Sequence, residues 1–267
     1  MLSDLHVEER VDKRKVNGLN EHNLAIAGDK LERAFLSIAK LVKKEQREAD
    51  IRTLVLWLGG DLFSGHIHED LVEVCELTPS QAIIWLRERI LAGIRYLLAE
   101  LDVERLLIVC SYGNHGRSTL KSRVSTLAEH SWEWLLYQVL QSDLAAEKRV
   151  HFEIAAGYIT YVDLGGFTIR FHHGDYIGYQ GGVGGITIPL RKAVDAWNVG
   201  QHADLDVIGH WHQRISLEWV EVNGSLIGFA PFSIRVKARL EPPQQSFFLV
   251  DLERRRKTGS FPVFVTP

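Results

Sequence analysis

Two apolar runs, each followed by a short polar motif, constrain the fold of this chain more than any other feature. The run at 54–58 (LVLWL) precedes Gly60-Asp61, and the run at 106–110 (LLIVC) precedes Gly113-Asn114-His115. Unbroken apolar runs are typical of strands covered on both faces, and functional sites in α/β folds lie beyond strand ends. The sequence therefore predicts an α/β protein with functional residues at the ends of buried strands.

Helical periodicity predicts four helices. A long amphipathic helix is expected at about 23–48, where apolar residues recur at helical spacing. Thr78-Pro79-Ser80-Gln81 predicts the start of a second helix, which should run to about residue 101, because it has a capping threonine, proline at the first helical position and a capping-box glutamine. A third helix is expected at 131–140 and a fourth at about 190–199. The buried side of the third is expected to hold Trp132, Leu135, Leu136 and Val139.

Strands are expected at 53–58, 105–110, 151–154, 158–164 and 167–171, with a hairpin turn at Gly165-Gly166. From 205 to 265 the sequence predicts strands, with turns at Asn223-Gly224 and Pro242-Pro243. Helices dominate the first half and strands the second, yet the polar motifs come from both. This distribution predicts one domain, residues 1–267, in which two packed mixed β-sheets are flanked by helices as a four-layer α-β-β-α sandwich.

The charge balance limits the kind of partner. The 31 Lys and Arg and 34 Asp and Glu give a formal net charge of -3, so a polyanion would have to bind through a local patch. No apolar stretch approaches the length of a membrane span, and residues 2–10 are too polar for a signal-peptide core. Cys75 and Cys110 are too few for a disulfide framework. We therefore expect a cytoplasmic protein without a membrane partner. The sequence leaves open whether the chain forms a homo-oligomer.

Five polar motifs supply the side chains that divalent metal ions prefer. They are Asp4-Leu5-His6, Gly60-Asp61, Gly113-Asn114-His115, His173-Gly174 and Gly209-His210-Trp211-His212. Carboxylates, imidazoles and an amide oxygen that converge on one point would hold such ions. Only three residues precede Asp4, where a full strand is expected, so the chain is either a shortened form or the product of an internal start.

In this order the motifs resemble those of the calcineurin-like metallophosphoesterases, and the resemblance spans residues 4 to 212. It implies two metal positions that share Asp61 as a bridge. The first would be held by Asp4, His6, Asp61 and His212, and the second by Asp61, Asn114, His173 and His210. His173 is preferred over His172 because the family places its ligand directly before glycine, and strand alternation sends His172 to the opposite face.

The resemblance also implies a mechanism. Two divalent ions that share a carboxylate acidify the water between them enough to supply hydroxide, and they neutralise charge on a phosphoryl group. Manganese is the favoured metal, with iron, zinc, magnesium and nickel as alternatives. His115, next to Asn114, is expected to protonate the leaving group or to stabilise the phosphorane.

Two positions depart from the family pattern. Many members carry an acidic residue three positions after the bridging aspartate, where it orients the histidine of Gly-Asn-His, but this chain has Ser64. Members also often place an acidic residue after that histidine, where this chain has Gly116. His66 or His68 is a candidate to compensate for Ser64, with a surface loop as the alternative.

Substrate preference is predicted from three further features. Gly60-Asp61-Leu62-Phe63 is similar to the double-strand-break repair nucleases of the superfamily, and the arginine-bearing motif of protein serine/threonine phosphatases is missing. Arg117, Lys121 and Arg123 are candidates to contact a phosphate backbone, with a solvated loop as the alternative. The glycine-rich segment at 181–185 lacks the lysine of a nucleotide-binding loop, so a flexible rim is expected.

The sequence thus favours a nuclease that acts on DNA or RNA. A phosphomonoesterase or small-molecule phosphodiesterase is the second hypothesis, and a metal-bound binding module without turnover is the third.

Overall fold

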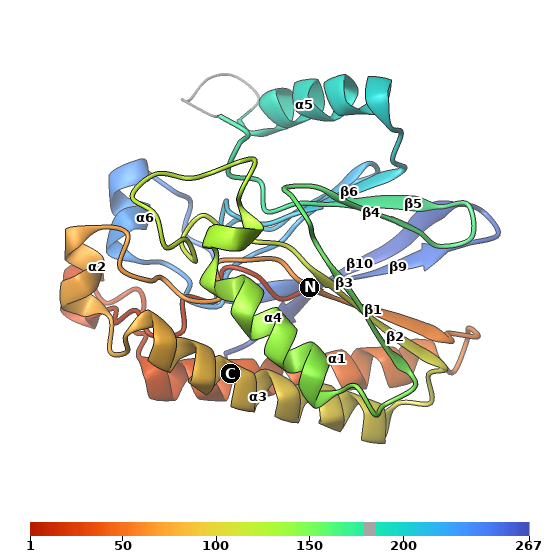
Figure 1. Cartoon of the computed structure of the whole chain (residues 1–267), viewed down its shortest axis with the longest axis horizontal. Coiled ribbons are helices and arrows are strands. Elements are labelled where there is room, and N and C mark those ends of the chain that lie inside the picture. The colour runs from red at the N-terminus through yellow and green to blue at the C-terminus, as the bar shows by residue number, and fades with distance from the viewer. Residues whose placement is uncertain (179–184, 267) are drawn as a thin grey trace.

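A computed structural model describes residues 1–178 and 185–266 and has four layers (Figure 1). Its helices are η1 (Lys13–Val16), α1 (Leu24–Glu45), α2 (Glu69–Val74), α3 (Pro79–Glu100), η2 (Ala128–His130), α4 (Trp132–Asp143), α5 (Thr187–Gly200) and α6 (Pro231–Val236). Its strands are β1 (Thr53–Leu58), β2 (Arg105–Cys110), β3 (Val150–Ile154), β4 (Thr160–Asp163), β5 (Thr168–Phe171), β6 (Leu205–Ile208), β7 (Ile215–Leu217), β8 (Val220–Val222), β9 (Gln244–Asp251) and β10 (Arg256–Phe264).

Two sheets form the middle layers. The first is parallel, in the order β1-β2-β3, and the second is mixed, in the order β4-β5-β6-β8-β7. Helices α1, α3 and α4 cover the outer face of the first sheet, and α5 covers the outer face of the second (Figure 1). The predicted α/β class and two-sheet sandwich are confirmed.

The core lies on both faces of the first sheet. Alternate strand residues such as Trp57 and Val109 point toward the second sheet, where they pack with Phe171 and Val207. Residues of the opposite parity, such as Ile108, pack with the helices. The apolar runs are buried on both sides, as their composition predicts.

The N-terminal segment joins the first sheet without a regular strand. Leu2 forms a parallel bridge with Leu58, its N–H donates to the Trp57 carbonyl at 2.8 Å, and its carbonyl accepts from Gly59 N–H at 2.8 Å. On its other side, Ser3 N–H donates to the Gln245 side chain at 3.0 Å. The segment therefore lies between β1 and β9, and this brings Asp4 to the end of β1.

Most predicted elements agree with the structure to within a few residues, but the last 60 residues do not consist of strands alone. They also contain α6, and the β7–β8 turn falls at 218–219 instead of at Asn223-Gly224. The Asn223 side chain instead donates to Ser3 Oγ and Gln245 Oε1, at 2.9 and 2.8 Å. The Asn-Gly pair therefore reflects a buried hydrogen-bond network and not a hairpin. The expected hairpin at Gly165-Gly166 is present, with positive φ at both glycines.

The predicted buried side of α4 is partly wrong: Leu136 is buried as expected and Val139 is half-buried, but the other two predicted residues are not buried. Glu133, Leu136, Tyr137 and Leu140 are buried, whereas Trp132 and Leu135 are exposed. The prediction used only the spacing of apolar residues. It could not place the Glu133 carboxylate on the buried face, so it chose a face that lies partly in solvent. Of the glycine-rich segment at 181–185, residues 181–184 lie outside the described residues. Within 1–178 and 185–266, no helix combines the length and apolar character that a bilayer crossing requires.

Candidate metal centre

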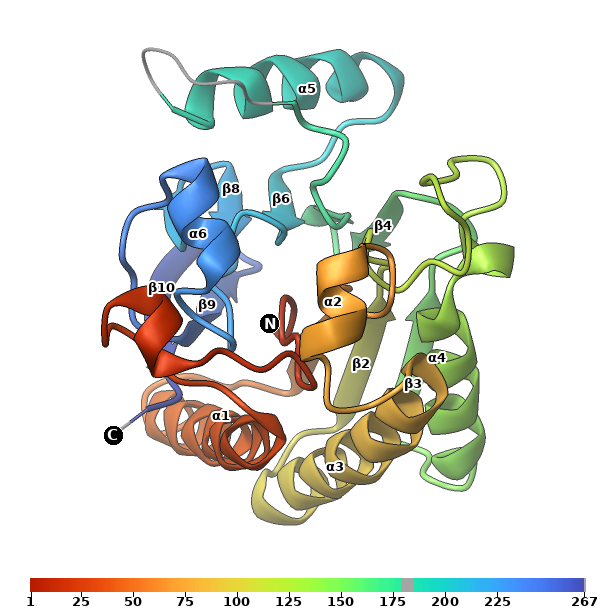
Figure 2. The ribbon, with the colours of Figure 1, turned by 90° about the vertical axis from the view of Figure 1, so that its left-hand side faces the viewer.

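The predicted ligands meet where the strands of both sheets end. Asp61 follows β1, Asn114 follows β2, His173 follows β5, and His210 and His212 follow β6. Asp4 and His6 reach the same place from the N-terminal segment, whose backbone N–H groups at Asp4 and Leu5 donate to the carbonyls of Gly60 and Asp61. In Figure 2, helices α2 and α6 and the loop that follows β2 surround this segment.

Asp4, His6 and His212 form the first of two convergent groups. One ligand atom of each lies within 4.8 Å of the other two. The Nε2 atoms of His6 and His212 are 3.2 Å apart, and His212 Nε2 is 3.5 Å from Asp4 Oδ1. Asp4 is held from behind, because Oδ2 accepts from Ser3 Oγ and Oδ1 accepts from His210 N–H at 2.9 Å.

Asp61, His173 and His210 form the second group, again with ligand atoms within 4.8 Å of one another. His173 Nε2 lies 3.0 Å from Asp61 Oδ2, and its Nδ1 lies 2.8 Å from the Gly59 carbonyl. A donor at Nδ1 leaves Nε2 as the metal-binding atom. His172 points away from this group and lies 3.4 Å from Asp206, so the structure places His173, and not His172, beside Asp61.

Asn114 supplies an independent indication that a cation belongs here. Its Oδ1 is buried and has no hydrogen-bond partner among the described residues. A buried carbonyl oxygen without a partner is unfavourable, and a divalent ion that accepts its lone pair would satisfy it. The two groups and this amide together offer the oxygen and nitrogen donors that manganese, iron or zinc bind.

Backbone strain is concentrated at the same residues. Asp4, His6, Asp61, His210 and His212 have φ between 46° and 71°, in the left-handed region. Among the described residues only three other non-glycine residues, Asn17, Lys237 and Arg255, share this conformation. Strained φ values of this kind persist where surrounding contacts enforce them, and they cluster at functional sites.

The electrostatics favour neutral imidazoles at two of the positions. Burial, together with His115 and His212, holds the pKa of His6 well below its ordinary value. Burial and His173 lower the pKa of His210 to about 3. Burial opposes ionisation of Asp61, but His173 and His115 hold the pKa of this carboxyl well below its ordinary value. Although burial opposes the charged form, Asp61 raises the pKa of His173 well above its ordinary value, and Asp4 raises the pKa of His212. The metal-free site therefore combines neutral imidazoles at His6 and His210 with an ionised Asp61 that is paired with His173.

Ser64 orients two histidines, which answers the first departure from the family pattern. Its hydroxyl lies 2.8 Å from His6 Nδ1 and 2.8 Å from Glu9 Oε2, to which it donates. Its backbone carbonyl lies 2.9 Å from His115 Nδ1. Glu9 is a residue that the sequence analysis missed, because it lies in no motif. The Glu9–Ser64–His6 chain fixes the ring that would carry Nε2 to a metal.

His115 is positioned by contacts with Asp61 and His6. Its N–H donates to Asp61 Oδ1 at 2.7 Å, and its half-buried ring meets the His6 ring edge-on at 4.8 Å between centroids. With Nδ1 donating to Ser64, Nε2 is free to exchange a proton. His68 also approaches, with its ring 6.3 Å from that of His115, whereas no contact places His66 there.

The three predicted phosphate-binding residues differ in their surroundings. Arg117 donates to the carbonyls of Asn114, Thr119 and Leu120, so its guanidinium organises the loop after β2. Lys121 and Arg123 are exposed. The loop is held near the second group because Tyr176, three residues after His173, donates its hydroxyl to the Arg123 carbonyl at 3.1 Å.

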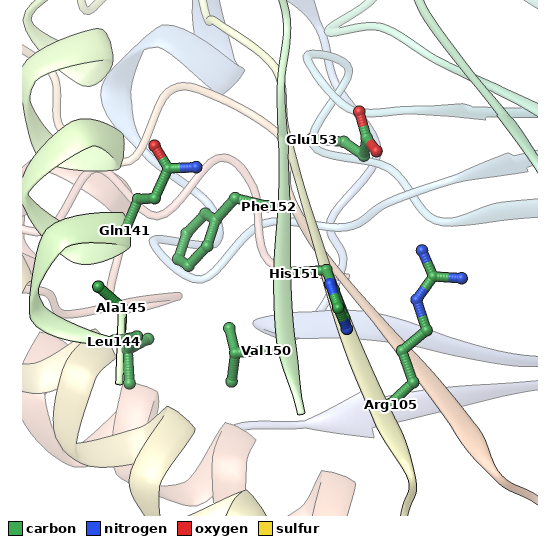
Figure 3. A pocket seen from close by; sticks show the side chains of 8 residues that line it. All are labelled: Arg105, Gln141, Leu144, Ala145, Val150, His151, Phe152 and Glu153. Atoms are coloured by element: carbon green, nitrogen blue, oxygen red, sulfur yellow. The ribbon is translucent and has the colours of Figure 1, made fainter. Parts of the chain in front are cut away.

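A separate groove of about 370 Å³ runs between α4 and β3 (Figure 3). Phe152 and Val150 line it from the strand, Gln141 lines it from the helix, and no predicted site residue is among its lining residues. The groove therefore does not belong to the metal centre.

No family model matches the sequence, and no curated protein matches it. Several solved structures align with the chain at low similarity. Vps29 from Entamoeba histolytica, complexed with zinc, is 16% identical over 59% of this chain and 76% of its own, with a TM-score of 0.34. A Streptococcus pneumoniae protein described as a predicted phosphoesterase is 13% identical over 74% and 82%, with a TM-score of 0.33. At these identities and scores the alignments assign no activity, so the geometry of the site alone bears on function.

Proposed function

We propose that this chain is a two-metal-dependent phosphodiesterase that cleaves nucleic acid. The observation that carries the proposal is the convergence of six donor residues from four segments in two groups, together with Asn114, whose Oδ1 is buried and unpartnered among the described residues. Asp4, His6 and His212 would hold one ion, Asn114, His173 and His210 the other, and Asp61 would bridge them. Bound divalent ions would activate water and neutralise the charge that develops on a phosphoryl group.

The chain's own residues would complete the chemistry. His115 faces the site with Nδ1 held by the Ser64 carbonyl, so a protonated Nε2 would donate its proton to the leaving oxygen. Asp61 would hold His115 in place through the backbone N–H, and this couples the acid to the bridging ligand. Burial of the ligand carboxylates excludes water that would otherwise screen their charge.

Two features support nucleic acid as the substrate class. Lys121 and Arg123 are exposed on a loop that is held beside the second group. On the other side, Arg239 and His212 line one small hollow, and exposed Arg235 and Lys237 precede Arg239. Cations on both sides of the centre suit a phosphate chain that extends past the scissile bond.

A phosphomonoesterase or small-molecule phosphodiesterase is the second candidate, and α2 favours it. Glu69, Asp70 and Glu73 are exposed on this helix, which begins directly after His68. His68 lies 6.3 Å from His115 between ring centroids, and three exposed carboxylates on the helix that follows it would repel a long phosphate chain and tolerate a compact ester.

One panel separates these candidates. Metal-free protein reconstituted with Mn²⁺ would be incubated with single- and double-stranded DNA, RNA, a chromogenic phosphodiester and a chromogenic phosphomonoester. Asp61→Asn protein, prepared identically, controls for contaminating nuclease. We expect cleavage of nucleic acid and of the diester by the wild-type protein only. Hydrolysis of the small esters without cleavage of DNA or RNA would exclude the nuclease, and no hydrolysis at all would favour a binding module.

A further inference from the structure

Glu133, in the first turn of α4, is a fully buried carboxylate that directly contacts both ligand-bearing loops of the first sheet. Its Oε1 accepts from Leu62 N–H at 2.9 Å, and its Oε2 accepts from Gly113 N–H at 2.7 Å. Leu62 directly follows Asp61, and Gly113 directly precedes Asn114. One carboxylate thus connects the residues adjacent to two predicted ligands.

The two loops approach each other so closely that small relative shifts matter. A Cβ atom on Gly60 would collide with the Gly113 backbone, and one on Gly113 would collide with Asp61. Asp61 also accepts from His115 N–H across the gap. The separation between Asp61 and Asn114 therefore depends on what holds the loops together, and Glu133 contacts both loops from outside them.

Gly116 leaves the space that Glu133 occupies. A Cβ atom at Gly116 would lie 2.9 Å from both Cγ and Cδ of Glu133. Glu133 itself is held in place because its N–H donates to Ser131 Oγ, and the neighbouring Trp132 N–H donates to the Gly116 carbonyl at 2.8 Å. An acidic side chain from a different segment thus lies against the position that follows His115.

We infer that Glu133 is a positioning residue that locks the Asp61 and Asn114 loops at the separation a shared metal position requires. The part of this inference that concerns the metal rests on the proposed function. A carboxylate suits the task because both of its oxygens accept, whereas glutamine offers one acceptor and one donor. A neutral substitute of the same size would leave either Leu62 N–H or Gly113 N–H without a partner.

Tyr137→Phe provides a matched control. Tyr137 lies one turn further along α4, is fully buried, and its hydroxyl lies 2.8 Å from the Ser111 carbonyl and 3.4 Å from the Leu58 carbonyl. It therefore contacts the ends of β2 and β1, but not the ligand-bearing loops beyond them. Its removal takes a buried hydrogen bond from the same helix without touching Leu62 or Gly113. An effect that Tyr137→Phe shares with the Glu133 variants therefore reports the packing of α4. An effect seen only in the Glu133 variants reports the separation of the two loops.

The first measurement uses metal-free protein, so it does not depend on the proposed activity. Amide hydrogen exchange would be followed by NMR in wild-type protein, Glu133→Gln, Glu133→Asp and Tyr137→Phe. We expect exchange at Leu62 or Gly113 to rise by about tenfold or more in both position-133 variants, since each loses good acceptor geometry. Unchanged exchange at both amides in folded Glu133→Gln and Glu133→Asp would overturn the inference.

The second measurement is a calorimetric titration of the same proteins with Mn²⁺. We expect one of two binding events to weaken by about 10- to 100-fold in Glu133→Gln, less in Glu133→Asp, and not in Tyr137→Phe. If Glu133→Gln does not fold, Glu133→Asp carries both measurements. Two ions bound with wild-type affinity by both folded position-133 variants would overturn the metal part of the inference. If the wild-type protein binds no Mn²⁺, the proposed function fails, and the exchange measurement still decides whether Glu133 locks the loops.

Discussion

Buried acids are compensated in two different ways in this molecule. In the second sheet, Asp206 is paired with Arg170 through two hydrogen bonds of 2.7 and 2.9 Å, and Glu221 is paired with Lys257 at 2.7 Å. All of these groups except Lys257 are at most 1% exposed, and Lys257 is 7% exposed on its side chain. This part of the fold supplies its own cations, so its charges are satisfied by the protein alone.

Around the candidate metal centre the same kind of buried acid has no such partner. Asp4, Asp61, Glu8 and Glu133 are at most 1% exposed, and within the described residues none forms an ion pair with lysine or arginine. Their partners are histidines, backbone N–H groups and the Ser3 hydroxyl. Burial raises the pKa of both Glu8 and Glu133 to about 7. Their hydrogen bonds with backbone N–H groups lower the pKa, but only in part. The contrast is that one region compensates its buried acids with arginine and lysine, whereas the other compensates them with histidines and backbone N–H groups. Under the proposed function, metal ions would complete this compensation.

The largest expected difference between the regions is in metal binding and activity. Asp61→Asn removes the bridging charge, so we expect bound Mn²⁺ to fall below two ions per chain and phosphodiester hydrolysis to fall by about 1,000-fold or more. Metal analysis and a chromogenic diester assay measure both. Full activity and metal content in Asp61→Asn would show that Asp61 does not bridge two metal ions.

Asp206→Asn is the matched change in the other region, and its effect should appear in stability. Arg170 cannot lose its proton, so it would stay charged beside a neutral amide, and we expect metal-free protein to unfold about 3–5 kcal/mol more easily. Asp61→Asn should cost metal-free protein much less, because His173 can deprotonate. Chemical denaturation of both variants measures the difference. Equal losses of stability would break the comparison, because both acids would then be structural.

His115→Ala sharpens the comparison within the site, since it separates chemistry from metal binding. We expect turnover to fall by about 100-fold or more while two Mn²⁺ ions stay bound, because His115 is a proton donor and not a ligand. His151→Ala, an exposed histidine on the groove beside α4, is the control and should change neither. Unaltered turnover in His115→Ala would rule out the acid role.

The smallest expected effect concerns a buried pair outside the site, His22 and Lys30, whose Nδ1 and Nζ are 3.2 Å apart. Burial and the Lys30 charge lower the pKa of His22 to about 3 in the folded chain, against its ordinary value of about 6.5. Between these values only the unfolded chain binds the proton, so His22 costs stability as pH falls below 6.5.

The slope is about 1.4 kcal/mol per pH unit. His22→Asn keeps an acceptor but cannot titrate, so between pH 6 and pH 5 it should lose about 1 kcal/mol less stability than the wild-type protein. The other buried histidines titrate equally in both proteins and cancel in this difference. Identical losses measured by denaturation would show that His22 is protonated in the folded chain.

The second convergent group and Asn114 were easier to predict from the sequence than the first group. Asp61, Asn114 and His173 follow predicted strands, and parallel strands bring their carboxyl ends to one edge. Asp4 and His6 follow no predicted strand. Their place depends on how residues 1–3 lie between β1 and β9, and the contacts on the β9 side come from residues more than 240 positions away. Such long-range pairing leaves no local pattern.

Glu9 and Glu133 could not be predicted for a related reason. Both are acids in segments without a motif, and Glu133 lies on a helix, where a polar residue is ordinarily expected to face solvent. Only the positions of Ser64, Leu62 and Gly113 give their carboxylates partners. The same cause made the predicted buried face of α4 partly wrong, because its most informative inward residue is charged.

The most direct test of this account is a count of metal ions together with a measurement of stability. Protein would be stripped with a chelator, titrated with Mn²⁺, and followed by elemental analysis and by chemical denaturation. We expect two ions per chain and an increase in unfolding free energy of about 2.7 kcal/mol for each ion present at 100 times its Kd. A stripped protein that takes up no ions, and whose stability does not change when Mn²⁺ is added, would contradict the claim that the buried acids of this site are compensated by metal.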